Sequence, residues 1–316
     1  MNLVASIALL TAFCVSAEAS ESQTVVRHGD WVVTGEEIVS NQHIVLDGNL
    51  VLKKDGRLTL RNCHVELVGQ KSREHIVDWQ GGKLITRKTI IGGTDRAGTA
   101  IHTVFHLYDG LWDAEDTVVE FSYGISFSDN NPGILRGKRL RAGRRPDAVI
   151  ASGLADITLE DSVFPVALGV YTHQGGRATL NLPSNQPLDV VFDGNSLTPG
   201  VKWKLELIRT VVPRWFVFLR NIGPTNPGCE IVLAQVEDVI VSLLGHNLTG
   251  EIHLTGDLSE PLHLGSLTLK RGPQQVKIPM WGLYFSGDNT DVRVSGKTHI
   301  CELMVRGGKV LFVGES

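Results

Sequence analysis

Two histidines and a tyrosine lie in a short segment, residues 101–109, whose sequence is IHTVFHLYD. If this segment is a β-strand, its side chains alternate between a buried and an exposed face. The buried face then carries Ile101, Thr103, Phe105 and Leu107, and the exposed face carries His102, Val104, His106 and Tyr108. His106 and Tyr108 would lie about 7 Å apart, so one substrate could contact an imidazole base and a phenol acid. We therefore predict His106, Tyr108 and His102 as candidate catalytic residues.

Zinc binding by the same histidines is not expected. His102 and His106 are four residues apart, which brings two ligands together on a helix but leaves them about 13 Å apart on a strand. Calcium is an alternative cofactor because it prefers oxygen ligands, and three carboxylates follow closely at Asp113, Glu115 and Asp116. Their spacing matches no known calcium loop, so the prediction is a site without a cofactor, with calcium possible.

A strongly basic stretch follows the histidine segment. Six of the ten residues 136–145 are Arg or Lys, in a chain whose net charge is −4. They are Arg136, Lys138, Arg139, Arg141, Arg144 and Arg145. Guanidinium groups bind carboxylates, sulfates and phosphates in bidentate geometry, so these residues are candidate substrate-binding residues for an acidic ligand. The alternative is a solvated segment, or one paired with neighbouring Asp and Glu side chains.

Two further groups of residues are better explained by structure than by chemistry. Tyr171 and His173 precede Gln174-Gly175-Gly176, a pattern typical of a strand end followed by a turn. Aromatic side chains of the C-terminal half could stack on sugar rings if their faces were exposed. These residues are Trp203, Trp215, Trp281 and Tyr284, and for most of them we predict core or cap packing instead.

The elements that would position all of these residues are strands. Apolar and polar residues alternate over residues 58–68 and more clearly over residues 117–128, which is typical of strands with one buried face. Convincing helical windows are nearly absent. Residues 128–147 contain Pro, Gly and many charges without clean alternation, so we predict an irregular basic loop there.

Several strands share a template. Residues 58–62 (LTLRN), 157–161 (ITLED) and 217–221 (VFLRN) each combine an apolar strand, a charged residue and then Asn or Asp. Comparable strand positions recur near residues 191, 218, 241, 268 and 293, every 23 to 27 residues, and such a period is typical of a solenoid. Because Asn and Asp tolerate a left-handed backbone, we expect these residues to stack where the chain turns a corner.

With this period and template, residues 28–313 resemble the right-handed parallel β-helix proteins of the pectin-lyase-like superfamily. The opening run, residues 29–34, 48–52 and 56–60, is similar to the first coils of such proteins. The resemblance implies an all-β fold, a single-stranded right-handed parallel β-helix. The alternatives are a twisted antiparallel sandwich, which the near-even spacing disfavours, and a β-propeller, whose blades need about 40 to 50 residues each. It also implies a uronate-rich glycan as ligand, because many β-helix proteins act on such glycans.

The resemblance is specific for the fold and much weaker for the activity. The Asp-Pro-His-Asp run of mannuronan epimerases is absent. The Arg-x-Pro-x-x-Arg pattern of pectate lyases is matched only in part by Arg144-Arg145-Pro146-Asp147, since the second Arg is missing. The catalytic assignment therefore depends on the His and Tyr residues themselves.

The N-terminus has the features of an export signal. Residues 3–15 are almost wholly apolar and are followed by Ala17-Glu18-Ala19, a small-x-small cleavage pattern. We expect residues 1–19 to be a signal peptide cleaved near Ala19, and residues 20–316 to form one secreted or periplasmic domain. No later stretch reaches about 18 uninterrupted apolar residues, so no membrane span is expected.

Three cysteines follow the predicted cleavage site: Cys63, Cys229 and Cys301. An odd number with wide spacing fits neither a disulfide framework nor a zinc site. We predict a small buried side chain in a strand for each, although one pair could bridge in an oxidising compartment.

Together these features predict an exported protein that engages an acidic polysaccharide and could cleave it by β-elimination. His106 and Tyr108 would act as base and acid, and the 136–145 stretch would hold the carboxylates. One alternative is a non-catalytic binding or structural solenoid. A second is a glycoside hydrolase with paired carboxylates, such as Asp129 with Asp147 or Asp161. The acidic net charge gives no general attraction to nucleic acid, and no phosphate-binding loop, serine elbow or zinc motif is present.

Overall fold

The computed structural model describes residues 23–120, 122–127, 131, 133–142, 155–164, 168–172, 176–181, 188–193, 203–208, 214–222, 228–234, 240–255, 262–264, 267–272, 280–297 and 299–314. Within these ranges every regular element is a β-strand, as the alternation of apolar and polar residues predicts. The predicted signal peptide, residues 1–19, lies outside the described residues. No helix of the described chain is long and apolar enough to cross a membrane.

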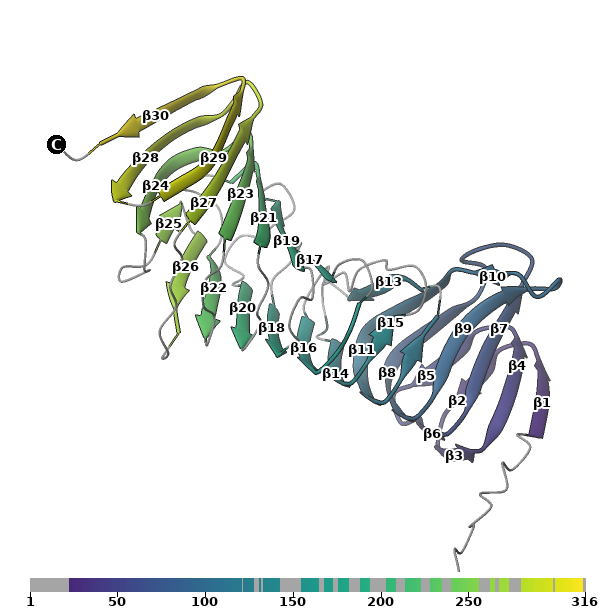
Figure 1. Cartoon of the computed structure of the whole chain (residues 1–316). Coiled ribbons are helices and arrows are strands. Elements are labelled where there is room, and N and C mark those ends of the chain that lie inside the picture. The colour runs from purple at the N-terminus through teal and green to yellow at the C-terminus, as the bar shows by residue number, and fades with distance from the viewer. Residues whose placement is uncertain are drawn as a thin grey trace, which may run out of the picture.

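The strands form four sheets, called A to D here (Figure 1). Sheet A consists of β1 (Gln23–His28), β4 (Gln42–Asp47), β7 (His64–Gly69), β9 (Ile90–Asp95), β12 (Val118–Val119) and β15 (Arg141–Ala142), with β10 (Ala100–Ile101) beside β9. Sheet C consists of β17 (Leu168–Thr172), β19 (Leu188–Asp193), β21 (Arg214–Arg220), β23 (Ile240–His246), β27 (Met280–Ser286) and β29 (His299–Arg306). Sheet D consists of β24 (Thr249–Thr255), β28 (Asp291–Lys297) and β30 (Lys309–Val313).

Sheet B is the largest and extends along most of the molecule (Figure 1). Its main path consists of β2 (Trp31–Val33), β5 (Leu50–Lys53), β8 (Ile76–Arg87), β11 (Thr103–Glu115), β14 (Gly133–Lys138), β16 (Ala155–Glu160), β18 (Gly176–Asn181), β20 (Trp203–Ile208), β22 (Cys229–Ala234), β26 (Leu267–Arg271) and β25 (Leu262–Leu264). Off this path lie β3 (Glu36–Ser40), β6 (Arg57–Arg61) and β13 (Ser122–Phe127).

Nearly all described strand pairs are parallel, and the two antiparallel ones join β10 to β9 and β25 to β26. After a strand of one sheet, the chain forms strands of another sheet and then returns to add a new strand parallel to the first. Val25, Ile44, Val65 and Ile91 are successive register partners of this kind in sheet A. Parallel pairs need long crossovers, and the antiparallel sandwich considered from the sequence is wrong.

The predicted repeat positions are confirmed only in part. Val191 and Phe218 are register partners in sheet C, and Val241 lies in the same sheet beside Trp215. Thr268 instead belongs to sheet B and Arg293 to sheet D. The reason is that period-two alternation looks the same in every sheet, so it does not tell which strand of one repeat matches which strand of the next.

The corners behave as the sequence template predicts. Asn62, Asp161 and Asn221 have φ angles of 51°, 49° and 50°, in the left-handed region that Asn and Asp tolerate. Such corners also stack on one another. The side-chain amide of Asn62 donates a hydrogen bond to Oδ1 of Asn41 at 2.9 Å, and that of Asn247 donates one to Oδ1 of Asn221 at 3.3 Å. Each stacked corner aligns the residue that precedes it with its counterpart on the next strand.

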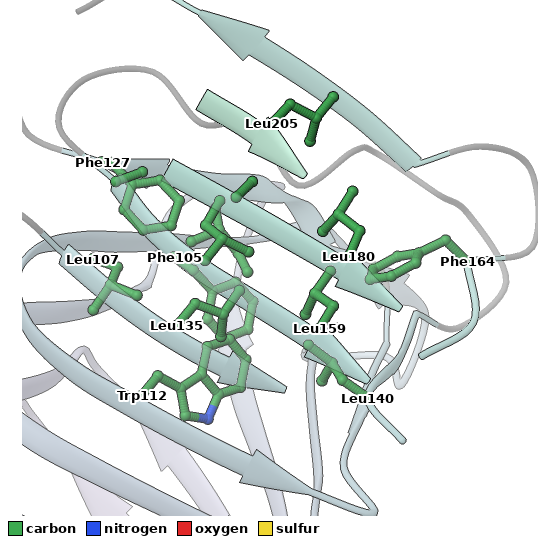
Figure 2. Close-up of a cluster of buried hydrophobic side chains, with 14 of the residues drawn as sticks. Phe105, Leu107, Trp112, Phe127, Leu135, Leu140, Leu159, Phe164, Leu180 and Leu205 are labelled. Atoms are coloured by element: carbon green, nitrogen blue, oxygen red, sulfur yellow. The ribbon is translucent and has the colours of Figure 1, made fainter. Parts of the chain in front are cut away.

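The core is one continuous cluster of inward-facing side chains that reaches from Trp31 to Val294. Figure 2 shows its middle part, where Leu135, Leu159, Leu180 and Leu205 lie on successive strands of sheet B. The rings of Phe105 and Trp112 stack beneath them, with centroids 5.3 Å apart. Burying such apolar surface contributes roughly 25 cal/mol per Å², and it fixes which face of each strand points outward.

The structure differs from two predictions made from the sequence. The irregular loop predicted for residues 128–147 is wrong for residues 133–142, where Gly133–Lys138 forms β14 of sheet B and Arg141–Ala142 forms β15 of sheet A. Its charged side chains alternate with Leu135 and Gly137, which face inward. The alternation of buried and exposed positions is hard to recognise in the sequence, because two of the buried positions are glycines and the stretch is rich in charges.

The cysteine prediction, a buried side chain in a strand, is fully confirmed only for Cys229 on β22, because Cys63 is buried but lies between β6 and β7. Cys63 and Cys229 are buried free thiols, and burial raises the pKa of Cys229 to about 12. Cys301 is an exposed free thiol, so the buried position predicted for it is wrong, because it lies on the edge strand β29. Trp281 is fully buried as predicted, whereas the side chains of Trp203 and Trp215 lie outside the described residues.

Candidate functional site

The histidine segment lies on the outer face of sheet B, as predicted. Phe105 and Leu107 are fully buried, while His106 is half-buried and Tyr108 is 40% exposed. The imidazole and phenol rings stack on each other, with centroids 4.7 Å apart and an interplanar angle of 10°. The structure therefore brings His106 and Tyr108 together more closely than strand spacing alone requires, and each ring covers one face of the other.

Burial lowers the pKa of His106, and the nearby carboxylate of Asp78 only partly opposes this effect. Asp78 is the register partner of His106 on β8. It accepts a hydrogen bond from Gln80, whose own amide oxygen accepts one from Lys53. The imidazole is thus uncharged near neutral pH and able to accept a proton.

His102 does not join this pair. It precedes β11, about 13 Å along the chain from His106 at the rise of a strand. Its backbone is bonded to another segment, because its carbonyl accepts a hydrogen bond from the amide of Arg73 and its own amide donates to the hydroxyl of Ser72. Of the three predicted catalytic residues, two meet and one lies apart.

The predicted cationic residues lie elsewhere and are engaged by carboxylates. Arg136 donates to both carboxylate oxygens of Asp156, at 3.1 and 2.9 Å. Arg139 donates to Asp116 at 2.6 Å and to Glu115 at 2.8 Å. These pairs match the alternative considered from the sequence, in which the basic stretch is neutralised by neighbouring acidic side chains.

The ion pairs lower the pKa values of the carboxylates that take part in them. Hydrogen bonds from Arg139 lower the pKa of Asp116. Burial by itself would raise the pKa of Asp156, but hydrogen bonds from Arg136 and Arg177 outweigh it and lower the pKa. Such bidentate pairs leave few donors for a ligand.

The remaining predicted cations do not complete the His106 patch. Lys138 and Arg141 are exposed on the surface. Lys138 pairs in register with Glu115, on the half of β11 that lies away from His106. Arg144 and Arg145 lie outside the described residues.

The carboxylates proposed as calcium ligands are also bonded to arginines. Asp113 pairs with Arg87 at 3.0 Å, and Glu115 and Asp116 pair with Arg139. Across the described part of the chain, no group of three or more His, Cys, Asp or Glu side chains could hold a metal ion.

A different site appears on the outer face of sheet C. A depression of about 600 Å³ lies over β21, β23, β27 and β29. It is lined by Arg220, Asn221, Leu244, Gly245, His246, Tyr284, Phe285, Ser286, Met304 and Arg306. The apolar side chains of Leu244, Tyr284 and Met304 are neighbours in register and form one side of it.

Beside this apolar strip runs a polar row that we call the sheet C row: Arg220, His246, Ser286 and Arg306. Adjacent strands lie about 4.8 Å apart, so the two arginines stand about 14 Å apart at the ends. Between them, His246 Nδ1 lies 3.2 Å from Ser286 Oγ. Beyond Arg220 the next register position is Asp193 on β19, and the structure does not describe its side chain.

The two arginines of the sheet C row differ from those of the basic stretch. Within the described residues, neither Arg220 nor Arg306 forms an ion pair, and both are exposed. Two exposed guanidinium groups flanking a hydroxyl and an imidazole can bind a chain that carries repeated carboxylates or sulfates. The neighbouring Tyr284 and Met304 offer apolar contact to the body of such a ligand.

Sequence analysis missed this row although its signal was present. Each member directly precedes a residue with a left-handed backbone: Arg220 before Asn221, His246 before Asn247, Ser286 before Gly287 and Arg306 before Gly307. The template that identifies the corners therefore also identifies the row. The basic stretch is easier to recognise because its charges lie close together in the sequence.

Sheet A carries another polar cluster that the sequence did not indicate. The rings of His43 and His64 stack with centroids 4.7 Å apart, and His43 Nε2 lies 2.9 Å from Glu66 Oε2. Burial lowers the pKa of His64, and the adjacent His43 lowers it further. Glu66 also accepts a hydrogen bond from Thr94. The carboxylate of Glu66 is thus engaged by side chains of its own sheet, as that of Asp156 is in sheet B.

Comparisons of the chain with protein-family models, with curated proteins and with solved structures found no match.

Proposed function

We propose that this protein is a right-handed parallel β-helix that binds an acidic polysaccharide in the depression over sheet C. The fold part of the proposal is supported by the parallel registers that recur along sheets A, B and C and by the stacked left-handed corners. A chain that keeps returning to pair in parallel with its previous strand has the connectivity of such a helix.

The single observation that carries the binding proposal is the sheet C row with its two exposed arginines, which form no ion pair in the described structure. A glycan with a charged group on each residue could place successive carboxylates or sulfates along a row of this length. Charge-assisted hydrogen bonds to such groups contribute about 1.5–3 kcal/mol each. The apolar strip beside the row would contact the sugar rings.

The test is a binding titration against a panel of uronate and sulfated polysaccharides at low ionic strength, with the variant Arg220→Ala/Arg306→Ala. We expect its affinity for the best glycan to fall about 100-fold, since about 3 kcal/mol of charge-assisted bonding is removed. The matched control Lys83→Ala/Arg293→Ala also removes two exposed positive charges and should bind like the unchanged protein.

The basic stretch provides the competing assignment, and Lys138→Ala/Arg141→Ala tests it. If that variant loses binding while Arg220→Ala/Arg306→Ala retains it, the site lies on the basic stretch and the sheet C assignment is wrong. Equal weakening in the Lys83→Ala/Arg293→Ala control would mean that only overall charge matters.

A second candidate function, cleavage of the glycan by β-elimination, is favoured by the uncharged imidazole of His106 stacked on Tyr108. A base and an acid are both required for that reaction, together with a cation to neutralise the uronate carboxylate. Release of unsaturated uronate ends is followed by ultraviolet absorbance, with and without calcium. His106→Ala should abolish it, and full activity of that variant would exclude His106 as the base.

A further inference from the structure

The two ends of the strand stack differ in polarity, and this difference goes beyond the proposed glycan site. At the N-terminal end, β1 and β3 each place one charged side chain in an inward position, on either side of the buried Trp31 of β2. Arg27 is the register partner of the buried Leu46, and Glu37 is the register partner of the buried Leu58. The Arg27 guanidinium lies 4.0 Å from the centroid of the Trp31 ring, and Trp31 Nε1 donates to Glu37 at 3.0 Å.

These contacts cover the N-terminal end of the core with polar groups. Trp31 is only 4% exposed, so the two charged side chains shield its ring while keeping their own charges in contact with water. Inward-pointing charges are a recognised way to prevent a sheet edge from pairing with another chain. The N-terminal end is therefore unsuited to association.

The opposite end, formed by β29 and β30 (Figure 1), places apolar side chains in the same inward positions. Leu303 and Val305 are the register partners of the buried Leu283 and Phe285, and Phe312 is that of the buried Val294. Their exposed fractions are 51%, 43% and 40%. Core rows that are fully covered elsewhere are thus open at this end.

The same end also offers unpaired backbone groups. β29 and β30 are the last strands of sheets C and D, and within the described residues no strand pairs with their outer edges. β29 is eight residues long and contains neither Pro nor Lys, the residues that commonly protect an edge strand. An apolar inner face and a long open edge together form a surface for strand addition.

We propose that this end is an interface with a second copy of the chain, in a two-fold arrangement that pairs the β29 strands antiparallel. A two-fold axis near Met304 would set Glu302 of one copy opposite Arg306 of the other, and opposite charges across a strand pair are favourable. The same axis would set Leu303 against Val305 on the inner side and so extend the core. Stacking on the N-terminal end would instead bury Arg27 and Glu37 against apolar side chains, which is costly.

The test is the mass of the full chain in solution, measured by sedimentation equilibrium without glycan. We expect a dimer at micromolar concentration. In a two-fold dimer the same patch is buried on both copies, so one substitution changes both sides of the interface. Val305→Lys, which places a charge in the exposed inner row, should give a monomer with an unchanged circular dichroism spectrum. Ile38→Lys introduces the same charge at an exposed apolar residue of the N-terminal end, 59% exposed against 43% for Val305, and should leave the dimer intact.

Charge reversal tests the register. Glu302→Arg should weaken the dimer at least tenfold, and Glu302→Arg/Arg306→Glu should restore it, since the pair is recreated with exchanged signs. An unchanged chain that stays monomeric up to about 100 µM would overturn the proposal, because specific two-fold interfaces persist at such concentrations. So would a dimer that survives Val305→Lys. Arg306 belongs to both proposals, since the glycan site and the dimer pair each use it. Glycan binding is therefore measured on the monomeric variant Val305→Lys, which keeps Arg220 and Arg306, so that the two proposals can fail independently.

Discussion

Sheets B and C both present a row of side chains just before stacked left-handed corners, and the two rows have opposite character. The sheet B row consists of Arg61, Arg87, Glu115, Lys138 and Glu160. In it, Arg87 lies 3.4 Å from Glu115, and Arg139 of the neighbouring corner also binds Glu115. The sheet C row, Arg220 to Arg306, holds two arginines without a described ion pair.

The difference shows that position in the fold does not decide what a charged side chain does. Both rows have the same strand spacing and the same corner geometry, with φ near 50° at Asp116 and Asn221. In sheet B the signs alternate from Arg87 to Glu160, so opposite charges lie side by side, and the ion pairs contribute modestly to stability at this exposure. In sheet C the cations are left for a ligand, and the depression beside them provides room for one.

A carboxylate introduced into the sheet C row should make it resemble the sheet B row, and among changes that convert one row toward the other we expect this one to have the largest effect. Ser286→Glu would place a carboxylate between Arg220 and Arg306. Glycan affinity should fall at least tenfold because the arginines gain an internal partner and the ligand meets a like charge. Ser286→Gln is the neutral control of matched size. Equal losses in both variants would indicate steric blocking rather than charge.

The reverse experiment removes a carboxylate from sheet B. Asp156→Ala leaves Arg136 and Arg177 without their shared partner, and the free energy of unfolding should fall by about 1 kcal/mol with glycan affinity unchanged. Denaturant titration measures the change. Glu160→Ala, on the same strand but exposed, should change stability by less than about 0.5 kcal/mol. A glycan affinity that rises in Asp156→Ala would show that sheet B can also bind when freed.

A smaller effect is expected from pH, and it should act on sheets A and B. The pKa values of His64 and His106 lie below the ordinary value of 6.5 because both are partly buried. The unfolded chain therefore binds protons first as pH falls, so stability should be full above pH 6.5 and decline below it. Thermal unfolding between pH 7.5 and 5.5 measures this decline.

The variant His64→Gln provides the check on that pH effect, because it removes one of the two titrating groups. Its stability should depend less on pH than that of the unchanged protein. A stability that increases as the pH falls through this range would contradict the assignment, since it would require these imidazoles to be charged in the folded state.

Much of the fold could be predicted from local patterns in the sequence. Alternation over residues 101–109 places Phe105 and Leu107 inside and His106 and Tyr108 outside, and the structure agrees. The template ending in Asn62, Asp161 and Asn221 correctly predicts three left-handed corners. These features follow from the chemistry of each segment, because period-two burial and left-handed backbone preference are decided within a few residues.

What only the tertiary structure decided is which distant side chains lie beside each other. The sequence shows Arg136 and Arg139 as part of a basic stretch, but the folded chain pairs them with Asp156, Glu115 and Asp116. It also aligns Arg220 with His246, Ser286 and Arg306 from four separate strands. Such neighbours depend on the register between strands, which is set by the lengths of the crossovers and by the packing of a shared core rather than by any local segment.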